Sequence, residues 1–145
     1  SHPTRWRDTM ARNRATHKSY VNSLPQGEEE PRDKIGEAIT NVAPLLVNDS
    51  ATLAAIILET GRTHQIRAQA AHHGHFLVGD FKYGGSKSEY PYYLHAWKLG
   101  FREKLFSDLP DTISAPIPDY FQEMIESIFA VEANEVYSVL RQFRP

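Results

Sequence analysis

The stretch that decides the fold is residues 42–58, Val-Ala-Pro-Leu-Leu-Val-Asn-Asp-Ser-Ala-Thr-Leu-Ala-Ala-Ile-Ile-Leu. Two apolar runs, Val42–Val47 and Leu53–Leu58, lie on either side of the polar Asn48-Asp49-Ser50. Asn and Asp tolerate left-handed backbone and bond their own turns, so this pattern predicts a strand, a turn and a second strand. The second run is apolar at every position, which favours a buried central strand.

On the C-terminal side, residues 62–73 are rich in alanine and contain no proline, and Gly74 follows them. This composition predicts a helix with a left-handed residue at its end. Residues 76–78 predict a short strand before a glycine-rich loop. Large residues then alternate with smaller ones over residues 93–101, which predicts a strand with one face in the core.

The ends of the chain differ in character. Helical apolar spacing predicts two closing helices within residues 119–143, the first begun by Asp119 and Gln122 as a capping pair. Residues 1–17 show no clear period and predict a basic, irregular arm, and the prolines, glycines and charges of residues 24–37 predict a loop. Strands that outnumber helices, joined as hairpins, predict an α+β fold with a mainly antiparallel sheet.

Composition narrows the function classes. With 145 residues, of which 41% are hydrophobic, the chain has the size and composition of a single globular domain, 1–145. It has no cysteine, which excludes disulfides, thiolate metal sites and thiol nucleophiles and suits a reducing, cytoplasmic location. Its longest apolar run is far short of the ~20 residues that span a bilayer, so we expect no membrane partner. The first residues are Ser1-His2 rather than methionine, as in an excised domain.

Charge is distributed unevenly along the chain. The formal net charge is −2, which alone argues against a strong nucleic-acid binder. The front end is nevertheless basic, with Arg5, Arg7, Arg12, Arg14 and Lys18. Acidic residues dominate residues 101–135. A basic front end can bind polyanions whatever the total charge, although two solvated faces would give the same pattern.

Residues 59–67, Glu-Thr-Gly-Arg-Thr-His-Gln-Ile-Arg, are the most informative for chemistry. Gly61 permits a tight turn from strand to helix, and a helix N-terminus presents free N–H groups and partial positive charge. Arg62, His64 and Arg67 add donors at the same place. The segment is therefore either an anion-binding corner or an exposed basic helix, and these residues alone do not separate the two.

The order of three motifs resembles the RluA-type pseudouridine synthase family. The motifs are Thr60–Arg67, the Gly79-Asp80-x-x-Tyr83-Gly84 loop and Leu94-His95-Ala96, and Lys18-x-Tyr20 resembles an upstream element of that family. The resemblance covers residues 18 to 118 and corresponds to the rear portion of the catalytic domain. It implies a mixed, largely antiparallel sheet flanked by helices. It also implies an enzyme that isomerises uridine to pseudouridine in ribosomal or transfer RNA, with no cofactor and no metal.

By motif position the resemblance also assigns residues. In the family an aspartate attacks the target nucleotide, the glycosidic bond breaks, and the uracil turns and rejoins the sugar through C5. Arg67 would pair with that aspartate and keep it ionised, and Tyr20 would contact the target base and help to remove the C5 proton. The RNA-binding residues that we expect from the resemblance and the basic front end are Lys18, Arg62, His64, Gln65, Arg12 and Arg14.

The sequence departs from the family at an important place. The family's nucleophile lies in a His-Arg-Leu-Asp motif, and this sequence contains none; Asp8 lacks the flanking residues of that motif. Gln69 also stands where the family usually has histidine. We therefore expect the N-terminal half of the catalytic domain to be a separate partner. The chain alone should be inactive, and Arg67 should face a cleft with no carboxylate opposite it.

Two other functions are possible from the sequence. One is a non-catalytic RNA-binding domain of the same family. The other is a metal enzyme that uses His72, His73 and His75, although the His-Glu-x-x-His spacing typical of such helical sites is absent.

Overall fold

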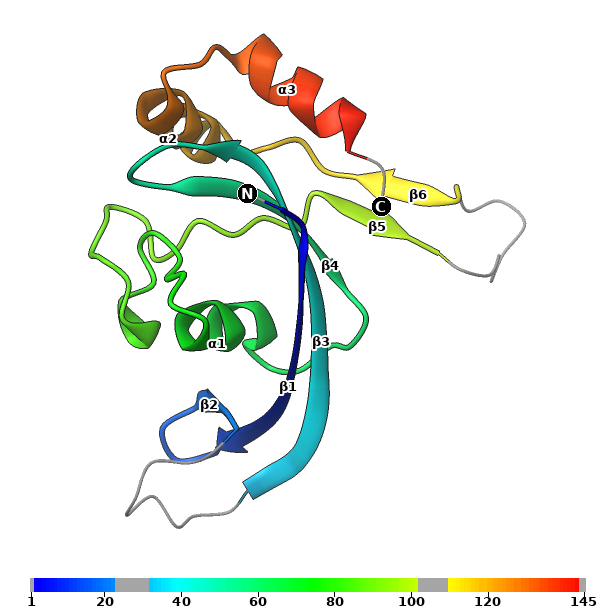
Figure 1. Ribbon diagram of the computed structural model, residues 1–145, viewed down its shortest axis with the longest axis vertical. Helices are drawn as coiled ribbons and strands as arrows, with labels where there is room; N and C mark the ends of the chain where they lie inside the picture. Colours follow the sequence, from blue (N-terminus) through cyan, green and yellow to red (C-terminus); the bar gives the residue numbers. More distant parts are fainter. Residues whose placement is uncertain (1, 23–31, 102–109, 144–145) are drawn as a thin grey trace.

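The structure, a computed structural model, describes residues 2–22, 32–101 and 110–143 (Figure 1). The elements in chain order are β1 (Thr4–Asn13), β2 (Lys18–Val21), β3 (Arg32–Val47), β4 (Thr52–Leu58), α1 (Gln65–His72), the 3-10 helix η1 (Phe81–Tyr83), β5 (Lys98–Gly100), β6 (Thr112–Ser114), α2 (Asp119–Phe129) and α3 (Ala133–Gln142). No helix in these ranges is long and apolar enough to cross a membrane.

The main sheet has the strand order β2-β1-β3-β4, and each neighbouring pair is antiparallel. The predicted hairpin is confirmed: Val47 pairs with Thr52, and the side-chain Oδ1 of Asn48 accepts hydrogen bonds from the backbone of Ser50 and Ala51. The predicted α+β class, with a largely antiparallel sheet flanked by helices, is also confirmed (Figure 1). The predicted central position of β4 is wrong, because β4 is an edge strand of the sheet as described and its interior residues are only half buried.

The N-terminal segment is not an irregular arm. Residues 4–13 form β1, which lies between β2 and β3. Trp6 and Met10 are buried on its inner face, and between them Asp8 occupies the core-facing position. The prediction failed because a charged residue at that position hides the alternation that identifies a strand. Part of the predicted loop 24–37 is likewise strand, since β3 begins at Arg32, while residues 24–31 lie outside the described ranges.

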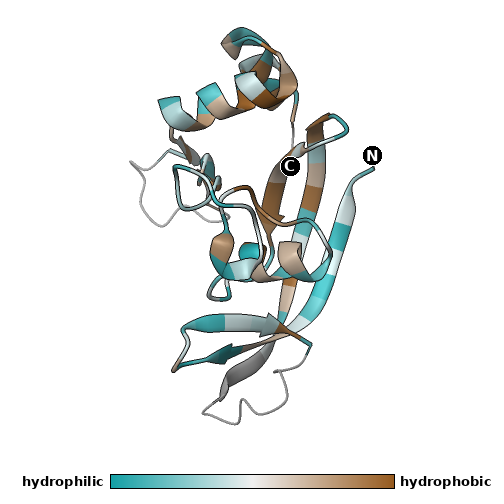
Figure 2. Cartoon of the chain, turned by 90° about the vertical axis from the view of Figure 1, so that its left-hand side faces the viewer, coloured by the Kyte–Doolittle hydropathy of each residue, from teal (hydrophilic) through white to brown (hydrophobic). Residues whose placement is uncertain are grey.

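Helix α1 packs against one face of the sheet, and α2 and α3 lie together near the β3–β4 turn (Figures 1 and 2). There are accordingly two apolar clusters among the described residues. The first joins Met10, Ala38, Ala68 and Tyr83 under α1. The second, built on α2 and α3, contains Ile117, Ile125, Val136 and Leu140 and contacts the β3–β4 hairpin through Leu45, Leu46 and Leu53.

Several local predictions need correction. The strand expected over residues 93–101 is reduced to β5, because Tyr93 packs in an aromatic cluster with Tyr90, Tyr120 and Phe121 instead of facing a neighbouring strand. Residues 76–78 form no strand. The two closing helices are confirmed as α2 and α3, but α2 follows Pro118 without a side-chain cap, and the capping box is on α3, between Glu132 and Glu135.

The loop after α1 depends on Gly85. An alanine Cβ at this position would collide with the backbone carbonyl of Leu77 and lie 3.0 Å from the backbone nitrogen of Asp80. At Gly61, in contrast, a Cβ would meet nothing within 4 Å. We therefore expect Gly85→Ala to lower the free energy of unfolding by about 1–3 kcal/mol and Gly61→Ala to lower it little, as measured by urea denaturation. Equal losses in the two variants would contradict this assignment.

Candidate active site

The rotation of α1 on the sheet is set by two buried glutamines one helical turn apart, Gln65 and Gln69. Gln65 Nε2 donates to the Ile39 carbonyl at 3.1 Å and to Thr40 Oγ1 at 2.9 Å. Thr40 Oγ1 in turn donates to Gln69 Oε1 at 2.6 Å, and Gln69 Nε2 donates to Asp8 Oδ2 at 2.7 Å. The helix is thus attached to β1 and β3 by side-chain amides as well as by the apolar contacts of Ala68.

The connection from β4 to α1 is organised around the same glutamine. Gln65 Oε1 accepts hydrogen bonds from Thr60 Oγ1 at 3.0 Å and from the backbone nitrogen of Arg62 at 2.9 Å. Thr60 Oγ1 also accepts from the backbone nitrogen of Ile39 at 2.8 Å. His64, the residue before the helix, has a left-handed backbone with φ 55°. The predicted helix start at residue 62 is therefore three residues too early, because residues 62–64 form a turn before the helix begins at Gln65.

Arg67 points away from the sheet and forms a two-pronged ion pair with Asp80. Its Nε donates to Asp80 Oδ2 at 2.8 Å and its Nη2 donates to Asp80 Oδ1 at 2.6 Å. The side chains are 11% and 1% exposed, so the pair is largely shielded from water. The carboxylate holds the pKa of Arg67 above its usual value, chiefly through the hydrogen bond. The expectation that Arg67 has no carboxylate opposite it is wrong.

Aromatic rings surround this ion pair. The Arg67 guanidinium carbon lies 4.3 Å from the ring centre of Tyr92 and 5.0 Å from that of Tyr83. Arg67 and Asp80 also line a cavity of about 310 Å³, whose wall further includes Gly79, Phe81, Lys82 and residues 87, 88 and 90–92. The arginine is therefore both charge-paired and packed against π faces, which fixes the plane of its guanidinium.

The predicted residues of β2 lie next to the same tyrosine. Lys18 Nζ is 5.3 Å from the ring centre of Tyr83 and 5.6 Å from that of Tyr20. The Tyr83 hydroxyl accepts a hydrogen bond from the backbone nitrogen of Ser19 at 2.8 Å. A continuous series of contacts thus runs from Tyr20 through Lys18 and Tyr83 to Arg67, which brings the two residues predicted as catalytic into one region.

His64 completes this region. Its Nδ1 lies 2.9 Å from the Tyr83 hydroxyl, whose proton is free to point at the ring because Ser19 donates to the oxygen. Burial lowers the pKa of His64 below 6.5, and the positive charges of Arg67, Lys82 and Arg12 lower it further. This arrangement favours the neutral imidazole with Nδ1 as acceptor.

The remaining residues predicted to bind RNA are more scattered. Arg12 Nη2 lies 3.4 Å from His17 Nδ1 at the β1–β2 turn, and Arg14 is exposed in that turn. Arg62 is exposed and its Nε donates to the Glu37 carbonyl at 3.1 Å. Gln65 must be corrected: it is 3% exposed and its amide is bonded within the fold, so it is a positioning residue for α1 and does not reach solvent.

The remaining basic residues of the front end lie on the outer face of β1. Arg5 pairs with Glu59 at 2.8 Å and Arg7 pairs with Glu37 at 2.6 Å. Both arginines are therefore balanced locally by carboxylates. Lys82, which the charge pattern did not single out, donates to the carbonyl of His17 at 2.6 Å and fastens η1 to the β1–β2 turn.

Sequence reasoning missed Asp80, Tyr83 and Tyr92 as parts of the site. Asp80 and Tyr83 stand in the quoted Gly-Asp-x-x-Tyr-Gly motif, and a carboxylate in a motif that accompanies an arginine motif was a usable signal. Tyr92 carries no such signal, because its contact with Arg67 depends on the path of the loop. Only the three-dimensional structure places it there.

In the cluster of His72, His73 and His75, His73 packs against β1. His73 stacks on Trp6 with ring centres 4.9 Å apart, and its Nε2 lies 3.0 Å from Asp8 Oδ2. Within the described ranges, no three His, Asp or Glu side chains are grouped as a metal site requires. These contacts join the end of α1 to β1.

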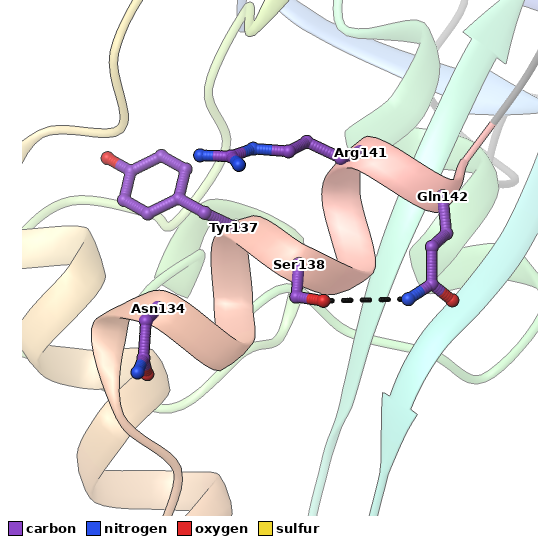
Figure 3. A pocket seen from close by; sticks show the side chains of 5 residues that line it. All are labelled: Asn134, Tyr137, Ser138, Arg141 and Gln142. Carbon is purple, nitrogen blue, oxygen red and sulfur yellow. Dashed lines mark hydrogen bonds between the residues drawn. The ribbon is translucent and has the colours of Figure 1, made fainter.

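A larger hollow lies elsewhere, on α3. It has a volume of about 490 Å³ and is lined by Asn134, Tyr137, Ser138, Arg141 and Gln142 (Figure 3). Ser138 and Gln142 share a hydrogen bond of 3.5 Å along the helix (Figure 3). None of the residues predicted for catalysis or RNA binding lines this hollow. We therefore do not include it in the candidate site, although it is larger than the cavity beside Arg67.

The coupling between Arg67 and Asp80 is measurable by a double-mutant cycle. We expect Asp80→Ala to lower the free energy of unfolding by about 3–5 kcal/mol, because it leaves a shielded guanidinium unpaired. Arg67→Ala should have a similar effect, and the double variant should lose clearly less than the sum of the two. Additive losses in urea denaturation would show that the two side chains do not depend on each other.

His64 predicts a pH dependence of stability. A histidine whose pKa is lowered in the folded state binds its proton more readily when unfolded, so folding loses stability as the pH falls below 6.5. His64→Asn keeps a residue that tolerates left-handed backbone and removes the titration. Between pH values above and well below 6.5, the variant should lose less stability than the parent chain in thermal melts. The same slope in both would mean that His64 titrates normally.

Comparison with known proteins finds sequences and a structure that are similar to this chain. No family model matches the chain. An uncharacterized RNA pseudouridine synthase of Bacillus subtilis is 37% identical over 91 residues, which are 62% of this chain and 32% of that protein. A protein of Haemophilus ducreyi named ribosomal large subunit pseudouridine synthase D is 36% identical over 86 residues, which are 49% of this chain and 26% of that protein.

A solved structure supports the fold. The human protein named RNA pseudouridylate synthase domain containing 1 matches with a TM-score of 0.61 and 19% identity, over 99% of this chain and 61% of that one. The chain spans about a third or less of the two curated relatives named above. The predicted resemblance to the RluA-type RNA pseudouridine synthase family is therefore confirmed, and the chain is similar to a part of the length of these relatives.

Proposed function

We propose that this chain is the arginine-bearing part of an enzyme that isomerises uridine to pseudouridine in ribosomal or transfer RNA. The observation that carries the proposal is the contact series from Tyr20 through Lys18 and Tyr83 to Arg67. Residues from β2, α1 and η1, far apart in the sequence, meet there with an aromatic face, a cation and a fixed guanidinium. The names of the relatives support RNA as the substrate.

Arg67 is suited to hold a second carboxylate. Asp80 uses the edge formed by Nε and one Nη2 hydrogen, and a guanidinium has five N–H groups. Within the part of the chain that the structure describes, the N–H groups of Nη1 and the second one of Nη2 remain for another partner. The aspartate nucleophile would come from sequence outside this chain, since the His-Arg-Leu-Asp motif is absent from it. Contact with Arg67 would keep that carboxylate ionised in a closed site.

The reaction needs no net gain or loss of atoms. The aspartate attacks the nucleotide and bonds to it, and the bond between the sugar and N1 breaks. The sugar then bonds to C5 of the turned uracil, and the bond to the aspartate breaks, which releases the carboxylate. The C5 proton leaves and N1 takes up a proton. Tyr20 would lie against the base, where its ring can stack and its hydroxyl can assist removal of the C5 proton. Lys18, beside Tyr20, would face the backbone phosphates of the RNA.

A second candidate function is a non-catalytic RNA-binding domain of the same family. The observation that favours it is the Arg67–Asp80 pair, which satisfies the arginine without any nucleophile. Both candidates use the same RNA-facing residues, so binding alone does not separate them. Turnover separates them, because only the first requires Arg67 to act on a carboxylate.

We expect the purified chain alone to form no pseudouridine in a uridine-containing RNA, because it supplies no nucleophile. Addition of a polypeptide that carries the family's His-Arg-Leu-Asp segment should restore turnover, measured by mass spectrometry after chemical labelling of pseudouridine. In the restored system, Arg67→Lys should lower the single-turnover rate by about 100-fold or more, because a point charge cannot hold two carboxylates in one plane.

The control for this experiment is Arg141→Lys, an exposed arginine on α3 outside the candidate site. It should leave the rate unchanged. Turnover by the chain alone would overturn the requirement for an external nucleophile. A complemented system that binds RNA and still forms no pseudouridine would favour the non-catalytic alternative.

A further inference from the structure

The cavity beside Arg67 has features that the proposed reaction does not use. Its wall contains Phe81, which is 68% exposed although it is aromatic. Lys87 Nζ lies 5.2 Å from the centre of that ring. Neither Tyr20 nor Lys18 lines this cavity, so it lies at the Tyr92 side of the arginine and not at the side where the target base is placed above.

The backbone that carries Phe81 is held firmly. The backbone nitrogens of Tyr83 and Gly85 both donate to the Asp80 carbonyl, at 3.1 Å and 2.8 Å. The facing loop is fastened by the backbone nitrogen of Tyr93, which donates to the Val78 carbonyl at 3.0 Å. A Cβ on Gly79 would lie 2.7 Å from the Tyr90 carbonyl, so the two segments approach closely. Phe81 is therefore an exposed ring on a fixed support, which reduces the entropy lost on binding a flat ligand.

The positive charge of the cavity lining favours an anionic ligand. Its lining includes the cations of Arg67, Lys82 and Lys87, and its acidic lining residue, Asp80, is already bonded to Arg67. Exposed aromatic rings interleaved with cations are the features that bind unpaired nucleotides, since every base has a π face and every linkage has a phosphate. A volume of about 310 Å³ is at the low end of small-ligand sites, which suits one nucleotide.

We propose that this cavity binds one unpaired nucleotide of the RNA next to the target uridine, with its base stacked on Phe81 and its phosphate facing Lys87. This inference rests on the proposed function for its substrate class and adds a second, separate nucleotide site to it. Arg67 lines the cavity with its Tyr92 side while its Tyr83 side faces Lys18 and Tyr20. Occupation of the cavity would therefore steady the same guanidinium that serves the reaction.

The test measures binding of a short single-stranded oligouridine in which one residue at a time is replaced by 2-aminopurine. Fluorescence anisotropy reports affinity, and quenching of 2-aminopurine reports stacking on an aromatic ring. Phe81→Ala should weaken binding roughly 5- to 100-fold, the range measured for loss of one base–aromatic stack, and should abolish quenching at one position. Phe81→Trp should restore both, because it keeps a ring at the same place.

The matched control is Phe76→Ala. Phe76 is also an exposed aromatic, at 52%, but it covers Gly84 and does not line the cavity. It should leave affinity and quenching unchanged. Lys87→Gln should reduce the slope of log affinity against log salt by about 0.7, as expected for one lost phosphate contact on a single strand. Binding of a duplex RNA should not depend on Phe81.

The outcomes separate this inference from the proposed function. If the chain binds the oligonucleotide and Phe81→Ala changes neither affinity nor quenching, the nucleotide site is overturned while the isomerase proposal stands. If Phe81 is required for binding and the complemented system forms no pseudouridine, the site is supported and the isomerase proposal falls. Absence of any binding by the parent chain at low salt would overturn the site as well.

Discussion

The attachment of α1 to the sheet by Gln65 and Gln69 is the constraint on which the candidate site depends. Buried amides must be hydrogen-bonded, and these two find partners only at one rotation of the helix, facing Thr40 and the β3 carbonyls. Each helical residue advances about 100° around the axis. Arg67 comes two residues after Gln65 and therefore lies about 200° around the helix axis from it, on the side of α1 that faces away from the sheet. There it faces the segments that carry Asp80 and Tyr92.

This constraint also explains the composition of the octapeptide. Thr60 and Gln65 are bonded to each other and to β3, and Gln65 further accepts from the backbone of Arg62. These residues make the turn and seat the helix, so most of the motif's specificity is structural. Arg67 and His64 are the members that contact the other residues of the candidate site, Asp80 and Tyr83. Membership of a specific motif is therefore not evidence that a residue contacts the substrate. Gln65 was assigned to RNA on that ground, but it is buried and its amide is bonded within the fold.

The sequence predicted those parts of the fold in which one local signal dominates. The β3–β4 turn is specified by Asn48, whose side-chain Oδ1 accepts hydrogen bonds from the turn backbone, and α2 and α3 are specified by apolar residues at helical spacing. β1 was missed because Asp8, with its side chain 7% exposed, occupies a core-facing position between Trp6 and Met10. Its burial is compensated by Gln69 and His73, which are more than sixty residues away in sequence. No local pattern can report such a partner.

In the candidate site too, the sequence motif predicted some residues, while the contacts between them depend on residues that are distant in sequence. The motif placed Arg67, Tyr20 and Lys18 in one region, as the structure does, but their contact passes through Tyr83, to which the motif assigned no role. Asp80 contributes most to the fixed orientation of Arg67. Its carboxylate orients the guanidinium in the chain as it stands, so under the proposed function a second carboxylate would meet a donor edge that is already in place. Bringing a nucleophile to a free, mobile arginine would cost side-chain entropy at each encounter. The pair therefore holds the guanidinium of Arg67 in place, and under the proposed function the nucleophile's carboxylate would bind N–H groups that Asp80 does not use.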